Sequence, residues 1–176
     1  PPMGDQELYD MTMAQFRPRT DPTHTLTAAG YSRQELAILR DFGPAFFGGR
    51  YRHYANRFGS HLLRLAEHDT EAVPKVILLR DGAAHILGVA ARDYRGLAAT
   101  ISGALWHRKI DIRQGHLFSA MNHGLALDFF HIHSPSGSIP SDLTRGVAEA
   151  IQQRRYIADV DEAALPSAQG RASLRE

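Results

Sequence analysis

The second half of the chain changes its hydrophobic period in a fixed order, which restricts the fold more than any other feature. Alternating or continuous apolar runs predict strands, and apolar residues at helical spacing predict helices. The resulting order is strand, helix, strand, strand, helix, over residues 84–91, 95–108, 109–120, 123–133 and 141–155. This order is most of a βαββαβ unit, in which both helices lie on one face of an antiparallel sheet. We therefore predict an α+β protein with a ferredoxin-like sheet.

The last strand of such a unit needs a separate explanation. The segment over residues 156–165, after the final helix, is short and acidic and soon passes into a polar tail. An apolar run before the turn signal Asp81-Gly82 instead predicts a hairpin with the first strand of the unit. A strand joined in this way is antiparallel to its neighbour and can occupy its free edge. We expect Val76–Leu79 in the fourth position, with residues 157–161 as the alternative.

The chain divides into four predicted segments. An extended N-terminal arm covers residues 1–30, a helical segment covers 31–73, the α+β domain covers 74–157, and a polar C-terminal tail covers 158–176. The arm is rich in Pro and Thr, which disfavour a packed element.

Two helices are expected in the segment before the sheet. Ser32 is a suitable N-cap, with Glu35 three residues later to form a capping box and Gly43-Pro44 as the stop. A second helix is predicted over residues 49–68, because large apolar side chains recur there at helical spacing: Tyr51, Tyr54, Phe58, Leu62 and Leu65.

Charge and composition exclude several classes of function. The chain has 176 residues with 20 Lys and Arg against 19 Asp and Glu, a net charge of +1, so nucleic acid is not an expected partner. It has no cysteine, hence neither disulfides nor thiolate chemistry. No apolar run reaches the roughly 18 residues of a membrane span, and the first residues lack the pattern of a signal peptide. We expect a cytoplasmic protein without membrane contact.

Residues 87–137 resemble an ACT domain. Four features occur in the same order as in that family: Asp93-x-x-Gly96-Leu97, a helix of small residues ending near Trp106, the strand "KIDIRQGHLFS", and the strand "GLALDFFHI". The similarity is greatest to the first of the two ACT domains of the bifunctional uridylyltransferases that modify the PII nitrogen-signalling protein. Residues 46–65 and 74–79 resemble the segment that precedes this domain in those enzymes.

The resemblance implies a regulatory role in nitrogen signalling rather than catalysis. ACT domains bind amino acids at the turn before the first helix, often across a subunit contact, and in this family a glutamine-like effector is implied. The chain departs from the pattern at Arg95, where the family commonly has Pro, and it has one ACT-like unit where the enzymes have two. The nucleotidyltransferase and metal-dependent hydrolase motifs of the enzymes are missing from this sequence.

The candidate ligand site comprises Asp93, Tyr94, Arg95, Gly96, Leu97 and Gln114. The free amides at the start of the helix near Gly96 can bind a carboxylate, and Asp93 can accept the α-ammonium group of an amino acid. Gln114, on the neighbouring strand or on that of a partner, is expected to reach a side-chain amide. Arg95 either clamps the carboxylate or occupies the space itself. The alternative is structural, with Gly96 serving the turn and Asp93 capping the helix.

A candidate interface lies on one face of the strand over residues 125–133. Leu125, Leu127, Phe129 and His131 point to one side, while Phe130 and Ile132 point to the other, so both faces need a cover. The helices of the unit cover one face. The N-terminal helices, a second copy of the chain or another protein could cover the other, and a homodimer is the leading expectation.

Metal, cofactor and enzyme hypotheses are weaker. His131 and His133 share a strand face and could chelate a metal, but the spacing supplies no third ligand, so we expect neither a metal nor a cofactor. Asp93, Asp111 and Asp128 accompany no nucleophile or catalytic motif. We expect a non-catalytic protein that binds an amino acid. The alternative is a structural subunit that docks through its ACT-like core and N-terminal arm without a ligand.

Overall fold

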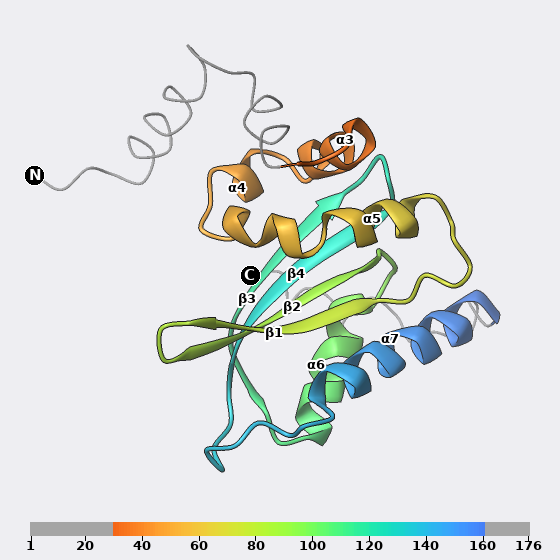
Figure 1. The fold of residues 1–176 in the computed structure, drawn as a ribbon. Helices are drawn as coiled ribbons and strands as arrows, with labels where there is room; N and C mark the ends of the chain where they lie inside the picture. Colours follow the sequence, from red (N-terminus) through yellow and green to blue (C-terminus); the bar gives the residue numbers. More distant parts are fainter. Residues whose placement is uncertain (1–29, 161–176) are drawn as a thin grey trace, which may run out of the picture.

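Four antiparallel strands form the sheet of residues 30–160, the part of the chain that the computed structural model describes. The strands are β1 (Lys75–Asp81), β2 (Ala84–Arg92), β3 (Asp111–Ala120) and β4 (Leu125–His133), in the spatial order β1-β2-β4-β3 (Figure 1). The α+β class is therefore as predicted. The predicted arm, apart from residue 30, and residues 161–176 of the predicted tail lie outside the described residues.

The hairpin of β1 and β2 places β1 at one edge of the sheet. Val76 pairs with Val89 and Leu79 with Ile86, as expected for the segment 76–79. The loop has only two residues, with Gly82 at φ +60°, and it is therefore a tight hairpin turn. Residues 157–160 continue a helix and do not pair with β2, so the alternative assignment is wrong.

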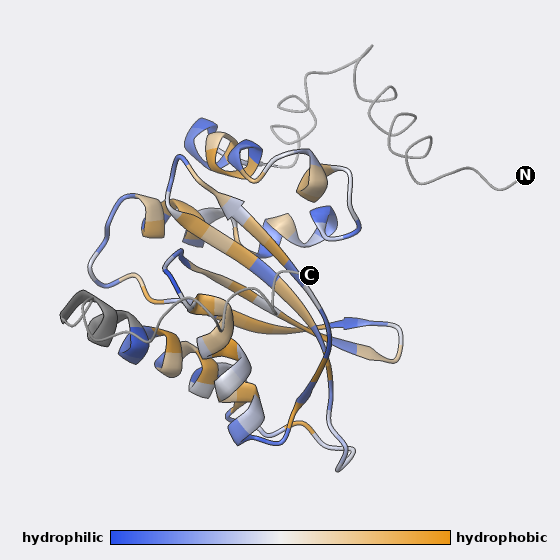
Figure 2. Ribbon diagram, turned by 180° about the vertical axis from the view of Figure 1, so that it is seen from behind, coloured by the Kyte–Doolittle hydropathy of each residue, from blue (hydrophilic) through white to orange (hydrophobic). Residues whose placement is uncertain are grey.

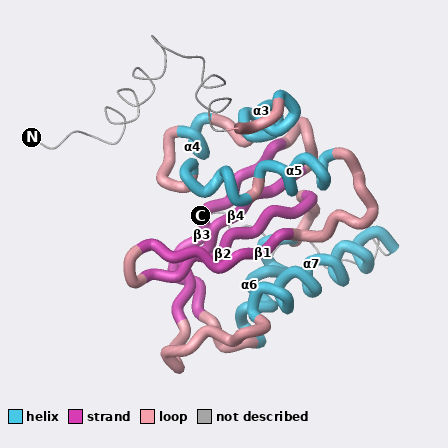
Figure 3. Tube along the Cα trace, in the orientation of Figure 1, coloured by secondary structure: helices cyan, strands magenta, loops and turns pink. Residues whose placement is uncertain are grey.

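Helices α6 (Leu97–His107) and α7 (Leu143–Val160) cover one face of the sheet (Figure 3). Their apolar residues recur every three or four positions, so each helix presents one stripe to the strands. The core on this side combines the predicted face of α6 with residues of both helices and both central strands: Leu97, Ile101, Leu105, Val147, Ile151, Leu87, Val89 and Phe130.

The opposite face is covered by the helices that precede the sheet. They are α3 (Arg33–Asp41), α4 (Pro44–Phe47), the 3-10 helix η1 (Arg52–Arg57) and α5 (Gly59–Ala66) (Figure 1). The cap of α3 is confirmed, since the Ser32 hydroxyl accepts a hydrogen bond from the Glu35 amide at 3.1 Å. The second predicted helix is interrupted at Phe58, where φ is -124°, and it divides into η1 and α5. Gly59 follows the break, and a Cβ there would lie 2.8 Å from the Tyr31 ring.

The apolar strands therefore form the middle of three layers (Figure 2). Side chains from the N-terminal helices and from the sheet make one continuous core on the second face, including Leu39, Phe46, Tyr51, Phe58, Leu62, Ile86, Leu127 and Phe129. These helices are thus an integral part of the described fold, and the sheet does not present a bare apolar face on that side.

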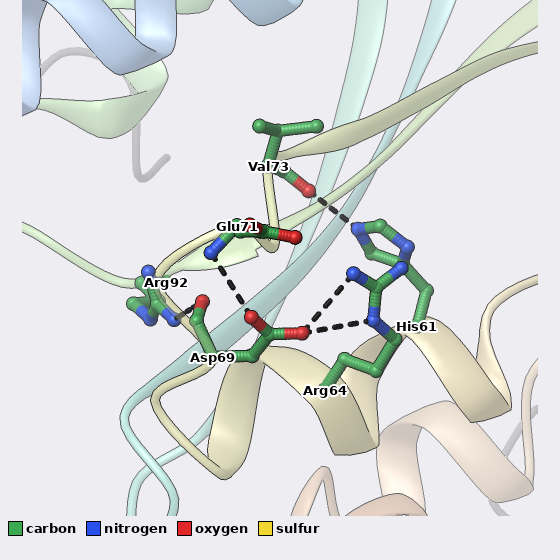
Figure 4. Close-up of polar contacts among 6 residues, drawn as sticks. All are labelled: His61, Arg64, Asp69, Glu71, Val73 and Arg92. Carbon is green, nitrogen blue, oxygen red and sulfur yellow. Dashed lines mark hydrogen bonds and ion pairs between the residues drawn. The ribbon is translucent and has the colours of Figure 1, made fainter.

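Polar contacts fix the connection between α5 and β1. The Asp69 carboxylate accepts hydrogen bonds from Arg64 at 3.1 and 3.2 Å and from the Glu71 amide at 3.0 Å (Figure 4). These bonds lower the pKa of Asp69, the Glu71 amide most strongly. The Arg92 guanidinium, at the end of β2, donates to the Asp69 carbonyl at 3.0 Å. The connection is therefore tied to the sheet as well as to its own helix.

Asp41 attaches the end of α3 to the turn between β3 and β4. Its carboxylate accepts from the backbone amide of Asn122 at 2.8 Å and from the side-chain amide at 2.7 Å, and it contacts Nδ1 of His123 at 2.8 Å. Burial alone would raise the pKa of Asp41, but the hydrogen bonds from His123 and Asn122 outweigh it and lower the pKa. This contact joins the helical layer to the same end of the sheet as the candidate site.

Candidate functional site

The turn between β2 and α6 is anchored to the loop that joins β3 and β4. The Asp93 amide donates to the Gly124 carbonyl at 2.8 Å, directly after the last residue of β2. The Asp93 carboxylate is exposed, and its Oδ2 accepts a hydrogen bond from the Ser119 hydroxyl at 3.3 Å. Backbone and side chain together therefore hold this carboxylate at the end of the sheet, where α6 begins.

The first turn of α6 has open hydrogen-bonding capacity. Gly96, at φ +97°, occupies the N-cap position and no side chain caps the helix. The Leu97 amide donates to the Tyr94 carbonyl at 3.2 Å, but the amides of Ala98 and Ala99 have no acceptor among residues 30–160. Open amides and the positive end of the helix dipole together favour an anionic group here.

Gly96 owes its place to backbone conformation. Its positive φ is the left-handed conformation that residues with a Cβ adopt at a cost. A Cβ at this position would meet nothing within 4 Å among the described residues, so no close neighbour requires glycine. The space over Gly96 is therefore open to a ligand. A turn with a purely structural role would have the same open space.

The other predicted residues of the turn divide into two groups. Tyr94 is half-buried and its hydroxyl donates to the Ile151 carbonyl of α7 at 3.3 Å, while Leu97 is buried in the core. These two side chains hold the turn against the helices. Arg95 is exposed beside Asp93. Of the predicted turn residues, the side chains of Asp93 and Arg95 and the backbone of Gly96 thus remain accessible to a ligand that binds the open amides of α6.

Gln114 does not join this group within the chain. A bulge at Arg113 shifts the register, so that Gln114 lies opposite His131 while Ser119 lies opposite Ala126. Ala126 belongs to the core under α6 and α7, whereas the His131 ring contacts Tyr51 of the N-terminal layer. Residues that pair across two strands share a face, so Gln114 lies on the face covered by the N-terminal helices and not on the face of α6. It is also five residues from Ser119 along β3, a distance of about 17 Å. Unbroken alternation from Ile112 would have put it on the α6 side.

The candidate interface residues require a similar correction. Leu125, Leu127 and Phe129 are at most 1% exposed, because the N-terminal helices of the same chain pack over them. His131 is partly buried and bonds to Tyr51 of that layer. Of the three possible covers for this face, the structure has the N-terminal helices. These side chains are not available to a second copy.

Asp128 is a buried carboxyl group that the sequence patterns alone did not select as part of the site. It is 4% exposed, and it is the one charged side chain buried to this degree among the described residues. Burial raises its pKa well above the ordinary value, and the nearby charge of Asp93 raises it further, against one hydrogen bond from the Phe118 amide. The sequence does contain a signal for it: Asp128 alternates with Ala126 and Phe130 along β4, so an acid lies on the same strand face as two apolar core residues.

Replacing Asp128 by asparagine is expected to stabilise the protein at neutral and higher pH, by about 1–2 kcal/mol. The folded protein keeps the Asp128 proton at pH values where the unfolded chain has lost it. Wild-type stability therefore falls as pH rises from the unfolded value, about 3.9, through the raised folded value. Urea unfolding at several pH values measures the difference. Equal curves for both proteins at pH 4 and above would contradict a protonated Asp128.

A second polar cluster lies on the other face, near the opposite end of β4. The Tyr51 hydroxyl and the Arg50 guanidinium both contact Nε2 of His131, the former at 2.7 Å. The His116 ring lies 4.8 Å from the Tyr51 ring. Arg50 and Tyr51 were not expected here, because the sequence pattern does not reveal which strand a preceding loop will contact.

The described residues contain no group of three or more His, Cys, Asp or Glu side chains that could hold a metal ion. None of the helices between residues 30 and 160 has the length and apolar character that crossing a bilayer requires. The chain matches no protein-family model and no curated protein.

Proposed function

We propose that the chain is a regulatory protein with an ACT-like core, which binds a small amino acid at the start of α6 and has no catalytic activity of its own. The observation that carries this proposal is the combination of uncapped amides at Ala98 and Ala99 with the Asp93 carboxylate, which Ser119 holds in the turn that leads into the same helix. A free amino acid carries one group for each: its carboxylate binds helix amides, and its ammonium group binds an acid.

The arrangement of the sheet supports the ACT-like part of the proposal. From β2 onward the order is strand, helix, strand, strand, helix, and both helices pack on one face. With β1 taken as the closing strand, the spatial order β1-β2-β4-β3 corresponds to that of a ferredoxin-like unit. The closing strand then comes from before the unit in sequence instead of after it.

In the proposed complex the ligand spans the turn. Its carboxylate accepts from the open amides of α6, and its ammonium group donates to Asp93, which Ser119 keeps in place. Arg95 is exposed at the same turn and adds a cation for the carboxylate, beside the helix amides. Gln114 has no part in this arrangement because it lies on the opposite face. A glutamine-like effector is the first to test, on the resemblance described above.

A docking protein without a ligand is the second candidate, and it is favoured by a different observation. Trp106, in the last turn of α6, is 79% exposed, and Met121, directly after β3, is 85% exposed. Among the described strands, β3 pairs only with β4, so its second edge has free backbone groups. Exposed large apolar side chains and a free edge suit a second copy or another protein. If the chain is instead the amino-acid-binding regulatory protein, the same edge of β3 is where ligand binding would act on a partner.

The test is a thermal-shift screen of the whole chain against glutamine and the other common amino acids. Binding is expected to raise the melting temperature by roughly 5–10 °C at about 100 times the dissociation constant. Asp93→Ala is expected to abolish the shift, because it removes the partner of the ammonium group. Asp111→Ala is the matched control, since Asp111 is an exposed acid at the far end of β3.

Two outcomes would decide against the amino-acid site. Either no amino acid shifts the melting temperature, or the shift survives in Asp93→Ala. A concentration-dependent mass in solution that Trp106→Ser abolishes, with no shift from any amino acid, would favour the docking protein.

A further inference from the structure

Four side chains join the N-terminal layer to the sheet on the face opposite the candidate ligand site. Arg50 and Tyr51 come from the loop between α4 and η1, His116 from β3 and His131 from β4. We call this group the histidine latch. Tyr51 is 2% exposed and stacks on Phe129 at a centroid distance of 4.5 Å and an interplanar angle of 15°. The latch therefore lies where the loop before η1 reaches the apolar face of the sheet.

The contact with Arg50 favours a neutral His131 ring. Nε2 of His131 lies against the guanidinium of Arg50 and, at 2.7 Å, against the hydroxyl of Tyr51. A guanidinium can only donate, so Nε2 accepts from Arg50 only when it carries no proton, and the proton of the neutral ring is then on Nδ1; the Tyr51 hydroxyl can donate or accept. An imidazolium has a proton on Nε2, loses the hydrogen bond from Arg50 and is placed directly against its positive charge.

His116 has a different reason to stay neutral. Its Nε2 is buried and has no hydrogen-bond partner among the described residues. The ring is held between Tyr51, at 4.8 Å, and His131, at 6.1 Å between centroids. An imidazolium carries a proton on both nitrogens, so charging His116 in this position would bury an N–H without an acceptor. The closed latch thus disfavours protons on both histidines.

We propose that the histidine latch is a pH-sensitive device: it holds the segment from α4 to η1 on the sheet when His116 and His131 are neutral and releases the segment when they take up protons. Release would remove Tyr51 from Phe129 and uncover the aromatic surface of Phe118 and Phe129. This function is separate from amino-acid binding, because Tyr51 belongs to the core under the N-terminal helices, while α6 packs on the other face of the sheet.

The surrounding charges act in the same sense, with one exception. Burial and then Arg50 lower the pKa of His116, with His131 adding to the effect. Burial and Arg50 also lower the pKa of His131, while Asp81 at the hairpin opposes them. Tyr54, whose ring contacts the exposed His53, and Asp81 also act on Tyr51. With both histidine pKa values depressed in the fold, stability is present above the unfolded value of about 6.5 and is lost as pH falls.

The test is hydrogen exchange of the full chain at about pH 7.5 and about pH 5.5, on either side of the ordinary histidine pKa and corrected for intrinsic rates. Amides of α4 and η1 are expected to lose protection at the lower pH by up to about tenfold per pH unit for each histidine, relative to amides of α6. The variant His116→Phe/His131→Gln removes both titrating rings, and its protection in these segments should not depend on pH. His133→Gln is the matched control, an exposed histidine two residues along β4.

Asp128 titrates with the opposite sign but is present in all of these proteins, so it cancels in the comparison. The proposal is overturned if protection of α4 and η1 in the wild type is independent of pH, or if the double variant retains the wild-type dependence. Should the double variant fail to fold, the ring signals of His116 and His131 in the unmodified protein give the answer. Titration midpoints below the ordinary histidine value of about 6.5 support the latch, and midpoints at or above it overturn it.

Discussion

Phe129→Ala is expected to lower the free energy of unfolding by about 3–5 kcal/mol, the largest effect of any single substitution considered. Phe129 has no exposed surface and lies against four other aromatic rings of the same core, including Tyr51 at 4.5 Å and Phe58 at 6.0 Å. Removing its ring leaves a cavity between the sheet and the N-terminal helices, which these rigid neighbours cannot fill completely. Urea unfolding at neutral pH measures the loss.

The control for this substitution is Met121→Ala, because Met121 is 85% exposed and should change stability by less than about 0.5 kcal/mol. The comparison also tests what covers this face of the sheet. If Phe129 instead belonged to an interface between two copies, its loss would weaken association and leave the unfolding of the separate chain almost unchanged. That result would contradict the packing of α3 to α5 over β4.

Gly88→Ala is expected to destabilise the protein by about 1–3 kcal/mol, because there is no room for an added methyl group. A Cβ at this position would lie 2.8 Å from Cζ of Phe58 and 3.3 Å from Cδ1 of Leu79, both buried side chains. Phe58 is held in the core on all sides and cannot move away without displacing its neighbours. Thermal or urea unfolding gives the magnitude.

Gly103→Ala provides a matched control with the opposite sign. Gly103 lies inside α6, and a Cβ there meets nothing within 4 Å among the described residues. Alanine should therefore stabilise the helix by about 0.5–1 kcal/mol through its higher helix propensity. Equal effects at the two glycines would mean that Phe58 does not pack against β2 as described.

Local signals in the sequence predicted the elements well. The Ser32 cap, the Asp81-Gly82 turn and the apolar stripe of α6 each depend on residues close together in the chain, and each was found in place. The pairing of Val76–Leu79 with β2 also followed from a local feature, the short hairpin. Where the chain itself fixes the geometry over a few residues, sequence reasoning had enough information.

The failures all involve contacts between distant segments. The bulge at Arg113 moved Gln114 to the other face, and nothing near it in the sequence marks this shift. The predicted helix over residues 49–68 is broken before Gly59, which packs against the Tyr31 ring, 28 residues earlier. The cover of Phe129 comes from the N-terminal helices and the partners of His131 come from the loop between α4 and η1, and the sequence pattern could not predict where either packs on the sheet. For the candidate site, the strand-to-helix turn at Asp93 and Gly96 is present as predicted, while Gln114 does not lie beside it.

The position of the turn relates the candidate site to the rest of the fold. Asp93 bonds to Gly124 and Ser119 at the β3–β4 end of the sheet, and Asp41 ties the end of α3 to Asn122 in the same loop. A ligand that orders the turn would thus act on a loop that also holds the helical layer. This continuity supplies a physical route from the ligand to the surfaces available to a partner.

The most direct measurement of ligand binding at the start of α6 is an amide spectrum of nitrogen-15-labelled protein, titrated with glutamine and then with the other amino acids. Binding is expected to shift the amide signals of Gly96, Ala98 and Ala99 together with that of Asp93, and to leave the amides around Gln114 unchanged. If millimolar concentrations of every amino acid leave the α6 amides unchanged, or if shifts occur only elsewhere in the chain, the turn has a structural role and the proposed ligand site is wrong.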